Sequence, residues 1–135
     1  MRLNRILCVD DDPDILAILD FSLTRIGSYT VLACSNGLSA VSEVTRFEPD
    51  LILLDVMMPG LSGPQTLAAL RGPPHAVSTP VVFMTARSLV HELEALLALG
   101  ATGLIVKPFN PLTLAQDILP YWEHGRRHRT KSVVH

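Results

Sequence analysis

Four short polar motifs, each placed at the end of an apolar run, carry the residues of this sequence that could do chemistry. Asp10 and Asp11 follow the first run, Asp55 ends another, Thr85 a third and Lys107 a fourth. Such runs are typical of strands buried on both faces of a parallel sheet. In an open α/β sheet, ligand groups converge at the carboxyl ends of the strands. The pattern therefore predicts that three carboxylates, a hydroxyl and an amine share one pocket.

Such a pocket is suited to accepting a phosphoryl group. Three neighbouring carboxylates repel one another unless some are protonated or a hard divalent cation is bound. Mg²⁺ meets this need because it prefers oxygen ligands and keeps waters that an incoming phosphate can replace. One carboxylate could then act as a nucleophile and form an aspartyl phosphate. Lys107 offers a positive charge to the phosphoryl oxygens, and Thr85 offers a hydroxyl donor.

The elements that must position these motifs alternate along the chain. Continuous apolar runs predict strands at residues 5–10, 29–33, 50–55, 80–85 and 104–107. Helical spacing with start and stop signals predicts helices from Asp12-Pro13 to Gly27, from Gly37 to about Phe47, up to about Leu70, from Ser88 to Leu99, and from about Pro111 to Trp122. Strand–helix units with short connections require right-handed crossovers. The pattern therefore predicts an α/β fold, a doubly wound parallel sheet with helices on both faces.

Single residues refine these boundaries. Asp12 is placed to cap the helix that follows it, and Gly100 to end the helix before it. Pro120 is expected to fray the last turn of the final helix. Gly60 and Gly63, in the Gly/Pro-rich stretch after Asp55, are expected to serve a turn.

Composition narrows the class of protein. With 135 residues, of which 48% are hydrophobic, the chain is long enough for one domain with a real core. Aromatic residues at 5% do not favour a nucleic-acid reader with stacking platforms. No apolar run approaches a membrane span and no signal peptide is apparent, so we expect a cytoplasmic protein. Cys8 and Cys34 are too few for a disulfide framework and are expected to be buried, reduced thiols.

The last residues of the chain are more basic than the rest. From Glu123 onward, Arg126, Arg127, Arg129 and Lys131 stand against one acid, although the net charge of the whole chain is −2. This segment has little to bury, which is typical of a solvated end. We therefore expect one domain over residues 1–122 and a basic, disordered tail over residues 123–135.

The four motifs together resemble those of response-regulator receiver domains of two-component systems. The matching segments are VDDD at 9–12, LLDVMMPG at 53–60, MTA at 84–86 and VKPF at 106–109, and the resemblance spans about residues 4–122. It implies a flavodoxin-like, five-stranded parallel sheet of order 2-1-3-4-5. The residue pattern by itself favours only a doubly wound sheet.

The resemblance also implies roles for the acidic residues. Asp55 would be the phosphoacceptor, and Asp11 and Asp55 would bind Mg²⁺ directly. Asp10 would act on the ion mainly through water, and the backbone carbonyl of Met57 would complete the protein ligands.

The resemblance further implies that Thr85 and Lys107 would contact the phosphoryl group. The cis peptide bond typical of the family would fall between Lys107 and Pro108, where the cis form costs little.

Two departures from the family pattern concern regulation. Receivers usually carry an aromatic residue three positions before the strand-end lysine, and here that position holds Leu104. Leucine cannot swing a polar ring between two environments, so a switch would have to act through other contacts. Met57 and Arg87 occupy positions that in receivers influence how readily water reaches the acyl phosphate. We hypothesise that Met57 crowds this water and Arg87 screens the phosphate, which would slow self-dephosphorylation.

The function implied is that of a signalling domain rather than a turnover enzyme. Asp55 would accept phosphate from a sensor histidine kinase or a histidine phosphotransfer protein. Residues 88–122 would then bind a separate effector protein, without direct DNA binding and without a membrane. The chain would be a stand-alone receiver, like the chemotaxis regulators, or a piece of a longer regulator.

Two alternatives belong to other classes. The chain could be a phosphorelay intermediate that hands its phosphate to a histidine phosphotransfer protein. It could also be a phosphatase with an Asp nucleophile, or a flavodoxin, which needs a hydroxyl-rich phosphate loop after the first strand. Acids after that strand would also repel a flavin phosphate.

Overall fold

Five buried strands form the centre of the molecule. The computed structural model describes residues 2–134, and for Val90 and residues 128–134 it describes the backbone alone. The strands are β1 Arg5–Val9, β2 Thr30–Cys34, β3 Leu51–Asp55, β4 Val81–Ala86 and β5 Gly103–Lys107. All neighbours are parallel, in the order β2-β1-β3-β4-β5. The predicted doubly wound sheet and its order 2-1-3-4-5 are confirmed.

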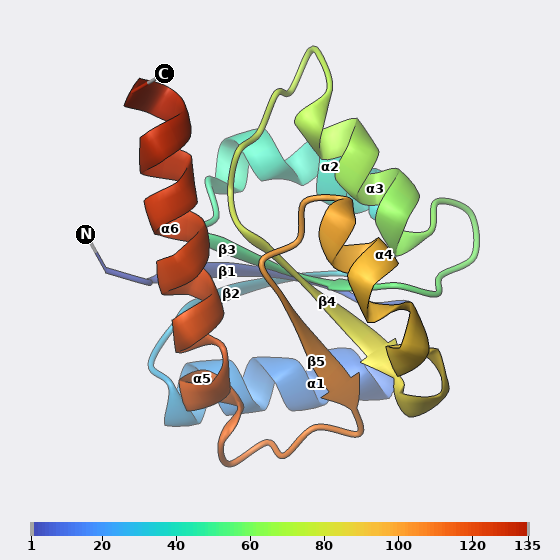
Figure 1. Cartoon of the computed structure of the whole chain (residues 1–135). Coiled ribbons are helices and arrows are strands. Elements are labelled where there is room, and N and C mark those ends of the chain that lie inside the picture. Colours follow the sequence, from blue (N-terminus) through green and yellow to red (C-terminus); the bar gives the residue numbers. More distant parts are fainter. Residues whose placement is uncertain (1, 135) are drawn as a thin grey trace.

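Helices cover both faces of this sheet (Figure 1). They are α1 Pro13–Phe21 with its π-helical continuation η1 Ser22–Ile26, α2 Gly37–Phe47, α3 Gly63–Arg71, the 3₁₀ segment η2 Arg87–Glu92, α4 Leu93–Ala98, α5 Leu114–Asp117 and α6 Leu119–Val134. Side chains of α2, α3 and α4 pack on one face of the sheet, around Phe83. Side chains of α1, η1, α5 and α6 pack on the other, around Met84. Because successive strand residues point to opposite faces, both cores draw on the same strands.

Side-chain caps explain where three helices begin. The carboxylate of Asp12 accepts a hydrogen bond from the Asp14 amide at the start of α1. Asn36 does the same for Ser39 in α2, and Ser62 opens α3 through a capping box with Gln65. Each cap satisfies amides that have no partner inside the helix. The caps thus place the loops that follow β1, β2 and β3.

The segment after β4 differs from the helix predicted over residues 88–99. It begins as the 3₁₀ segment η2, and the α-helix α4 starts only at Leu93, where Glu92 makes no side-chain capping bond. Short 3₁₀ turns are frequent at the ends of α-helices. Gly100 follows α4 with φ +109°, in the place predicted for the helix end.

The sequence predicted that the last helix ends at Trp122, but α6 continues beyond this residue. Instead of fraying a final turn, Pro120 lies in the first turn of α6, where a missing amide hydrogen costs nothing. A Cβ on Gly125 would lie 2.6 Å from Pro80 Cβ, so α6 approaches the sheet closely at this glycine. The Arg126 guanidinium lies 5.2 Å from the Trp122 ring centre. These contacts accompany a helix that runs past the predicted boundary at Trp122. The division into a domain over residues 1–122 and a basic tail over residues 123–135 stays a prediction, and His135 lies outside the described residues.

Both cysteines are buried and free, as expected. Val9, not Cys8, is the register partner of Cys34, so the two thiols point to opposite faces of the sheet. Burial raises the pKa of both thiols above the ordinary value, which keeps them protonated and unreactive. Within residues 2–134, we find no helix with the length and apolar character needed to span a membrane.

One buried hydroxyl ties η1 to the loop after β5. Ser22 is fully buried, and its Oγ donates a hydrogen bond of 2.5 Å to the carbonyl of Pro111. The contact joins segments 89 residues apart in the chain. It fixes the loop that leads away from Lys107 against the helix that begins after Asp10 and Asp11.

Ser22→Ala is expected to destabilise the protein by about 1–2 kcal/mol, because the Pro111 carbonyl would lose its buried donor. Chemical denaturation monitored by circular dichroism measures the change. Ser42→Ala is the matched control, since the exposed Ser42 hydroxyl bonds only within its own helix and should change stability little. Equal effects of the two substitutions would contradict the role assigned to Ser22.

Candidate functional site

The register of the strands brings the predicted site residues to one edge of the sheet. Val9 pairs with Leu54, so Asp10 continues β1 beside Asp55 at the end of β3. Asp55 in turn pairs with Met84, one residue before Thr85. Ala86 pairs with Lys107, the last residue of β5. Residues spread over almost a hundred positions thus end their strands at the same level.

Three carboxylates form a compact acidic cluster at this edge. Asp10, Asp11 and Asp55 each offer an oxygen, and these oxygens lie within 4.8 Å of one another. Asp10 is fully buried and Asp55 is 5% exposed, whereas Asp11 is exposed to solvent. The cluster therefore has a buried floor and one open side.

Backbone contacts hold Asp10 in place. Its amide donates to the Cys34 carbonyl at 3.1 Å, and its Oδ1 accepts from the Asp12 amide at 2.9 Å. The same turn places Asp12 at the cap of α1. One short segment therefore fixes a buried carboxylate and starts a helix.

Lys107 reaches into the cluster from β5. Its Nζ lies 2.6 Å from Asp10 Oδ2 and 3.1 Å from Asp55 Oδ1, so one ammonium pairs with two buried carboxylates. The sequence predicted that Lys107 faces a phosphoryl group but did not predict its pairing with Asp10. The Lys107-Pro108 peptide bond is cis, as predicted.

The electrostatics of the cluster leave Asp55 short of compensating charge. Burial and the charge of Asp10 raise the pKa of Asp55 from 3.8 to about 6, although Lys107 pulls in the opposite direction. Burial opposes the charge of Lys107, but the two carboxylates outweigh it and raise the pKa of the ammonium above its ordinary value. The site therefore holds a firmly charged lysine and a carboxylate that still gains from another cation.

The other predicted residues lie around this cluster. Thr85 is buried and pairs with Val106, and its Oγ1 lies 3.5 Å from the Ala86 carbonyl. Met57 follows β3 with its side chain 68% exposed, and Arg87 is exposed at the start of η2. The structure thus places a hydroxyl, a thioether and a guanidinium at the ends of β3 and β4. Their roles, including that of the Met57 carbonyl, stay predictions.

Gly63 supports the site in a way that the sequence did not predict. A Cβ on this residue would lie 2.4 Å from the Asp55 carbonyl oxygen and 2.8 Å from Val56 Cα. Its amide donates to the Val56 carbonyl at 2.9 Å. Gly63 thus permits the first turn of α3 to lie against the backbone of Asp55, whereas Gly60, with φ +75°, is the glycine that serves a turn. A glycine directly after the capping Ser62 was the sequence signal for such a close approach.

The donor set of the cluster fits a hard divalent cation. Carboxylate oxygens are the ligands that Mg²⁺ prefers, and it binds through few protein groups while it keeps several waters. The exposed Asp11 and the open side of the cluster leave room for such waters. Asp10, Asp11 and Asp55 could therefore hold the ion, and the raised pKa of Asp55 indicates that bound positive charge would relieve repulsion.

Comparison with known proteins identifies the family of the chain. The family profile described as the response regulator receiver domain matches residues 6–119. The chain is 36% identical over 123 residues to the sensor histidine kinase GacS of Pseudomonas protegens, covering 89% of this chain and 13% of GacS. It is 41% identical over 105 residues to the transcriptional regulatory protein PrrA of Mycobacterium tuberculosis, covering 78% of this chain and 44% of PrrA. The chain thus spans only part of the curated relatives it matches.

Solved structures show the same fold. The chemotaxis response regulator CheY4 of Vibrio cholerae aligns with a TM-score of 0.79 and 29% identity, over 89% of this chain and 99% of CheY4. NtrX of Brucella abortus aligns with a TM-score of 0.83 over 99% of this chain and 30% of NtrX, and its 23% identity supports the fold alone. The profile covers most of the chain, and CheY4 matches along nearly its whole length. This chain belongs to the response regulator receiver domain family.

Proposed function

We propose that Asp55 accepts a phosphoryl group from a phosphohistidine of a sensor kinase or a phosphotransfer protein, and that the phosphorylated domain binds a separate partner. The observation that carries this proposal is the buried Asp55 carboxylate, which lies beside two further acids and 3.1 Å from an ammonium group. The receiver-family membership of the chain supports it.

Asp55, Lys107 and Thr85 have different roles in the proposed phosphoryl transfer. An Asp55 oxygen attacks phosphorus, a P–O bond forms, and the P–N bond to the histidine breaks as imidazole leaves with the electron pair. Lys107 lies where it could turn from Asp10 and Asp55 toward a phosphoryl oxygen and neutralise its charge. Thr85 supplies a hydroxyl donor from the end of β4. The chain thus positions the reacting groups and stabilises the charge on the phosphoryl group, while the donor supplies the bond that breaks.

Mg²⁺ is the proposed cofactor. When bound, it neutralises negative charge on the carboxylates and on the transferring group. Asp10, Asp11, Asp55 and the Met57 carbonyl are the proposed protein ligands, with Asp10 acting mainly through water. The three carboxylates carry this assignment because their oxygens cluster within 4.8 Å.

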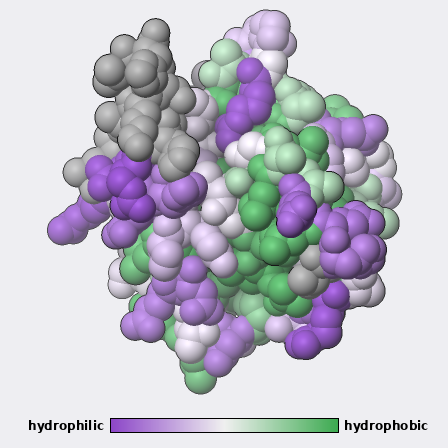
Figure 2. Space-filling view, viewed as in Figure 1, coloured by the Kyte–Doolittle hydropathy of each residue, from purple (hydrophilic) through white to green (hydrophobic). Residues whose placement is uncertain are grey.

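The proposed output face is formed by α4, β5 and the α5–α6 region. Leu93 and Leu97 on α4 are 36% and 37% exposed. They line a cavity of about 300 Å³ together with Leu104, Val106 and Tyr121. Figure 2 shows hydrophobic surface on the face that also presents α4 and β5. An effector protein that covers this surface would bury apolar area now exposed to water.

We infer a signalling domain rather than a turnover enzyme, because Asp55 keeps the phosphoryl group until hydrolysis or back-transfer. The phosphorelay alternative draws support from the similarity to a segment of a sensor histidine kinase. Rapid return of phosphate from Asp55 to a histidine phosphotransfer protein, with slow hydrolysis, would favour the relay over effector binding.

Acetyl phosphate with Mg²⁺ is expected to add one phosphoryl group to the wild-type chain and none to Asp55→Asn, because asparagine lacks the nucleophilic oxygen. Intact mass spectrometry measures the gain, and chelation of divalent ions should abolish it. Asp20→Asn, an exposed acid on α1, is the control and should be phosphorylated like the wild type. A gain that persists in Asp55→Asn would place the acceptor elsewhere, and no gain in any sample would refute the proposed function.

Asp55→Asn is also expected to stabilise the metal-free protein at pH 8, by on the order of 1 kcal/mol. The folded pKa of Asp55, about 6, lies above the ordinary 3.8, so the folded state binds more protons than the unfolded state between these values. Stability of the wild type therefore falls as pH rises toward 6, and this loss stays in full above it. Asp55→Asn lacks the titrating carboxyl and therefore lacks this loss of stability. Its stability advantage over the wild type should vanish near pH 4.

Thermal unfolding with a chelator at several pH values tests this expectation. Excess Mg²⁺ should shrink the difference at pH 8, because the ion binds the folded wild type and stabilises it. Asp20→Asn serves again as the control and should show neither effect. A variant Asp55→Asn that is less stable than the wild type at pH 8 without metal would contradict the inferred repulsion.

Met57→Asn is expected to speed loss of the phosphoryl group roughly three- to tenfold, which corresponds to about 0.6–1.4 kcal/mol of barrier. The exposed thioether beside Asp55 would otherwise crowd the attacking water, whereas an amide can hydrogen-bond it. Decay of the phosphorylated species after removal of acetyl phosphate, followed by intact mass, measures the rate. Leu99→Asn, an exposed substitution beyond α4, is the control; an unchanged rate in Met57→Asn would count against the hypothesis.

A further inference from the structure

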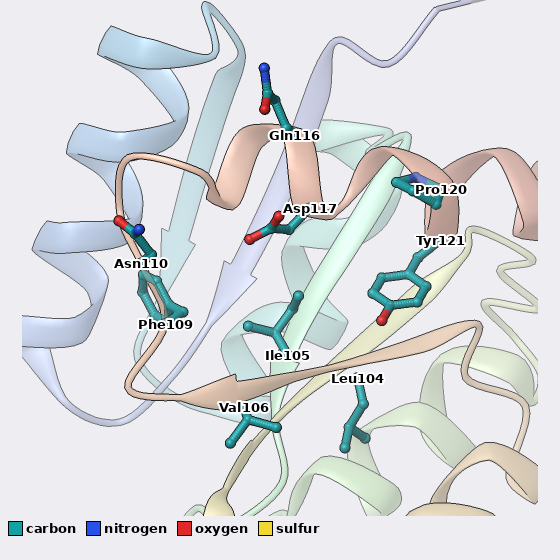
Figure 3. A pocket seen from close by; sticks show the side chains of 9 residues that line it. All are labelled: Leu104, Ile105, Val106, Phe109, Asn110, Gln116, Asp117, Pro120 and Tyr121. Atoms are coloured by element: carbon teal, nitrogen blue, oxygen red, sulfur yellow. The ribbon is translucent and has the colours of Figure 1, made fainter.

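The ring of Tyr121 occupies the space that a side chain at position 103 would fill. A Cβ built on Gly103 would lie 2.2 Å from Tyr121 Cγ, 2.3 Å from Cδ1 and 2.6 Å from Cδ2. No pair of unbonded carbons can approach so closely, so the ring rests on the bare backbone of β5. Figure 3 shows Tyr121 reaching from α6 toward this strand. The glycine thus lets an aromatic ring of α6 lie against the outermost strand of the sheet.

Two cavities meet at this ring. One, of about 430 Å³, is lined on one side by Phe109, Asn110, Gln116 and Asp117. The other, of about 300 Å³, is lined by Leu93, Leu97 and Thr102. Tyr121, Leu104 and Val106 line both. The ring therefore stands between a cavity with polar walls and a cavity with apolar walls, and has space on either side.

Each cavity is lined by residues that follow a residue of the phosphoryl site closely in the chain. Phe109 and Asn110 of the polar cavity follow Lys107 and Pro108 in the chain. The α4 residues of the apolar cavity follow Thr85 through the six-residue segment η2. Ser22 holds the loop after Lys107 at Pro111, whereas η2 is a short 3₁₀ segment, whose hydrogen-bond geometry is poorer than that of an α-helix. The apolar wall is therefore the one more easily moved.

We propose that Tyr121 is a gate whose ring turns between these two cavities according to the state of Asp55. Movement of Thr85 and η2 toward a phosphoryl group shifts α4 and changes the width of the apolar cavity, while the wall held by the Lys107 loop stays in place. The ring follows the cavity that widens, and so exposes or covers the apolar surface of Leu93 and Leu97. The proposal rests on the proposed function, because the phosphoryl group on Asp55 is the signal.

The ring can be observed directly by fluorine NMR of protein labelled with 3-fluorotyrosine. The chain holds two tyrosines, so Tyr29→Phe leaves Tyr121 as the only label. Spectra are recorded before and after acetyl phosphate with Mg²⁺, and intact mass is measured on the same samples. We expect the Tyr121 resonance to shift or split when the mass increases, and to stay unchanged in a sample that also carries Asp55→Asn.

Fluorine NMR and intact mass together distinguish failure of the Tyr121 gate from failure of the proposed function. A mass gain with an unchanged Tyr121 resonance would overturn the gate and leave the proposed function standing. No mass gain in any sample would overturn both. A shift of equal size in Asp55→Asn would also overturn the gate, because the ring would then respond to the reagents and not to Asp55.

Gly103→Ala tests the two ring positions without phosphorylation. The new Cβ takes the place of the ring, so the resonance should already be displaced in the unphosphorylated protein and change little afterwards. Gly72→Ala is the matched control, since a Cβ there meets only the Ala68 carbonyl oxygen, at 3.3 Å, and should leave the resonance in place. If Gly103→Ala does not fold, Leu97→Ala, which widens the apolar cavity, should displace the resonance instead. A wild-type resonance in the folded variant would overturn the gate.

Discussion

One ammonium group shared by two buried carboxylates is the interaction on which the rest of the site depends. Asp10 is fully buried and Asp55 nearly so, and a buried charge without a partner is strongly destabilising. Lys107 supplies that partner at 2.6 Å and 3.1 Å. Yet one positive charge does not balance three acids, and burial together with the charge of Asp10 raises the pKa of Asp55 to about 6. The fold thus keeps a cluster that is stable enough to form and still deficient in positive charge, which suits the cation and the phosphoryl group proposed for it.

The sheet brings the Lys107 ammonium into contact with acids that lie far from it in the sequence. Asp10 and Lys107 belong to strands separated by β3 and β4, and only a shared register brings their ends to one level. Close backbone approach is part of this arrangement, because Gly63 allows α3 to begin against the carbonyl of Asp55. A change of one residue in any register would turn the strand-end side chains to the other face. The two cores that flank the sheet therefore also fix the chemistry of its edge.

Most of this arrangement could be predicted from the sequence, because it follows from strong local patterns. Apolar runs ending in Asp55, Thr85 and Lys107 marked the strands and the edge where they meet. Long-range contacts were the part that could not be predicted. The pairing of Lys107 with Asp10 depends on side-chain reach across the sheet, and the continuation of α6 past Trp122 depends on how Gly125 lies against Pro80. The sequence pattern placed the end of the helix near Trp122, whereas packing against the neighbouring segment favours a longer helix. The weak start of α4 was missed for a related reason, since no capping residue marks it.

The position of that weak start connects the site to the surface of the molecule. Between Thr85 and the exposed leucines of α4, the chain passes only through η2. The route along β5 is stiffer, because its strand pairs residue by residue with β4 and the loop beyond Lys107 is held by Ser22. A displacement that begins at Asp55 meets least resistance where hydrogen bonding is poorest. Leu104, the second residue of β5, has no aromatic ring, and the aromatic side chain that lies against this strand, Tyr121, comes from α6. The segment between β4 and α4 is therefore the least restrained part of the proposed output face, whereas β5 is held by its pairing with β4.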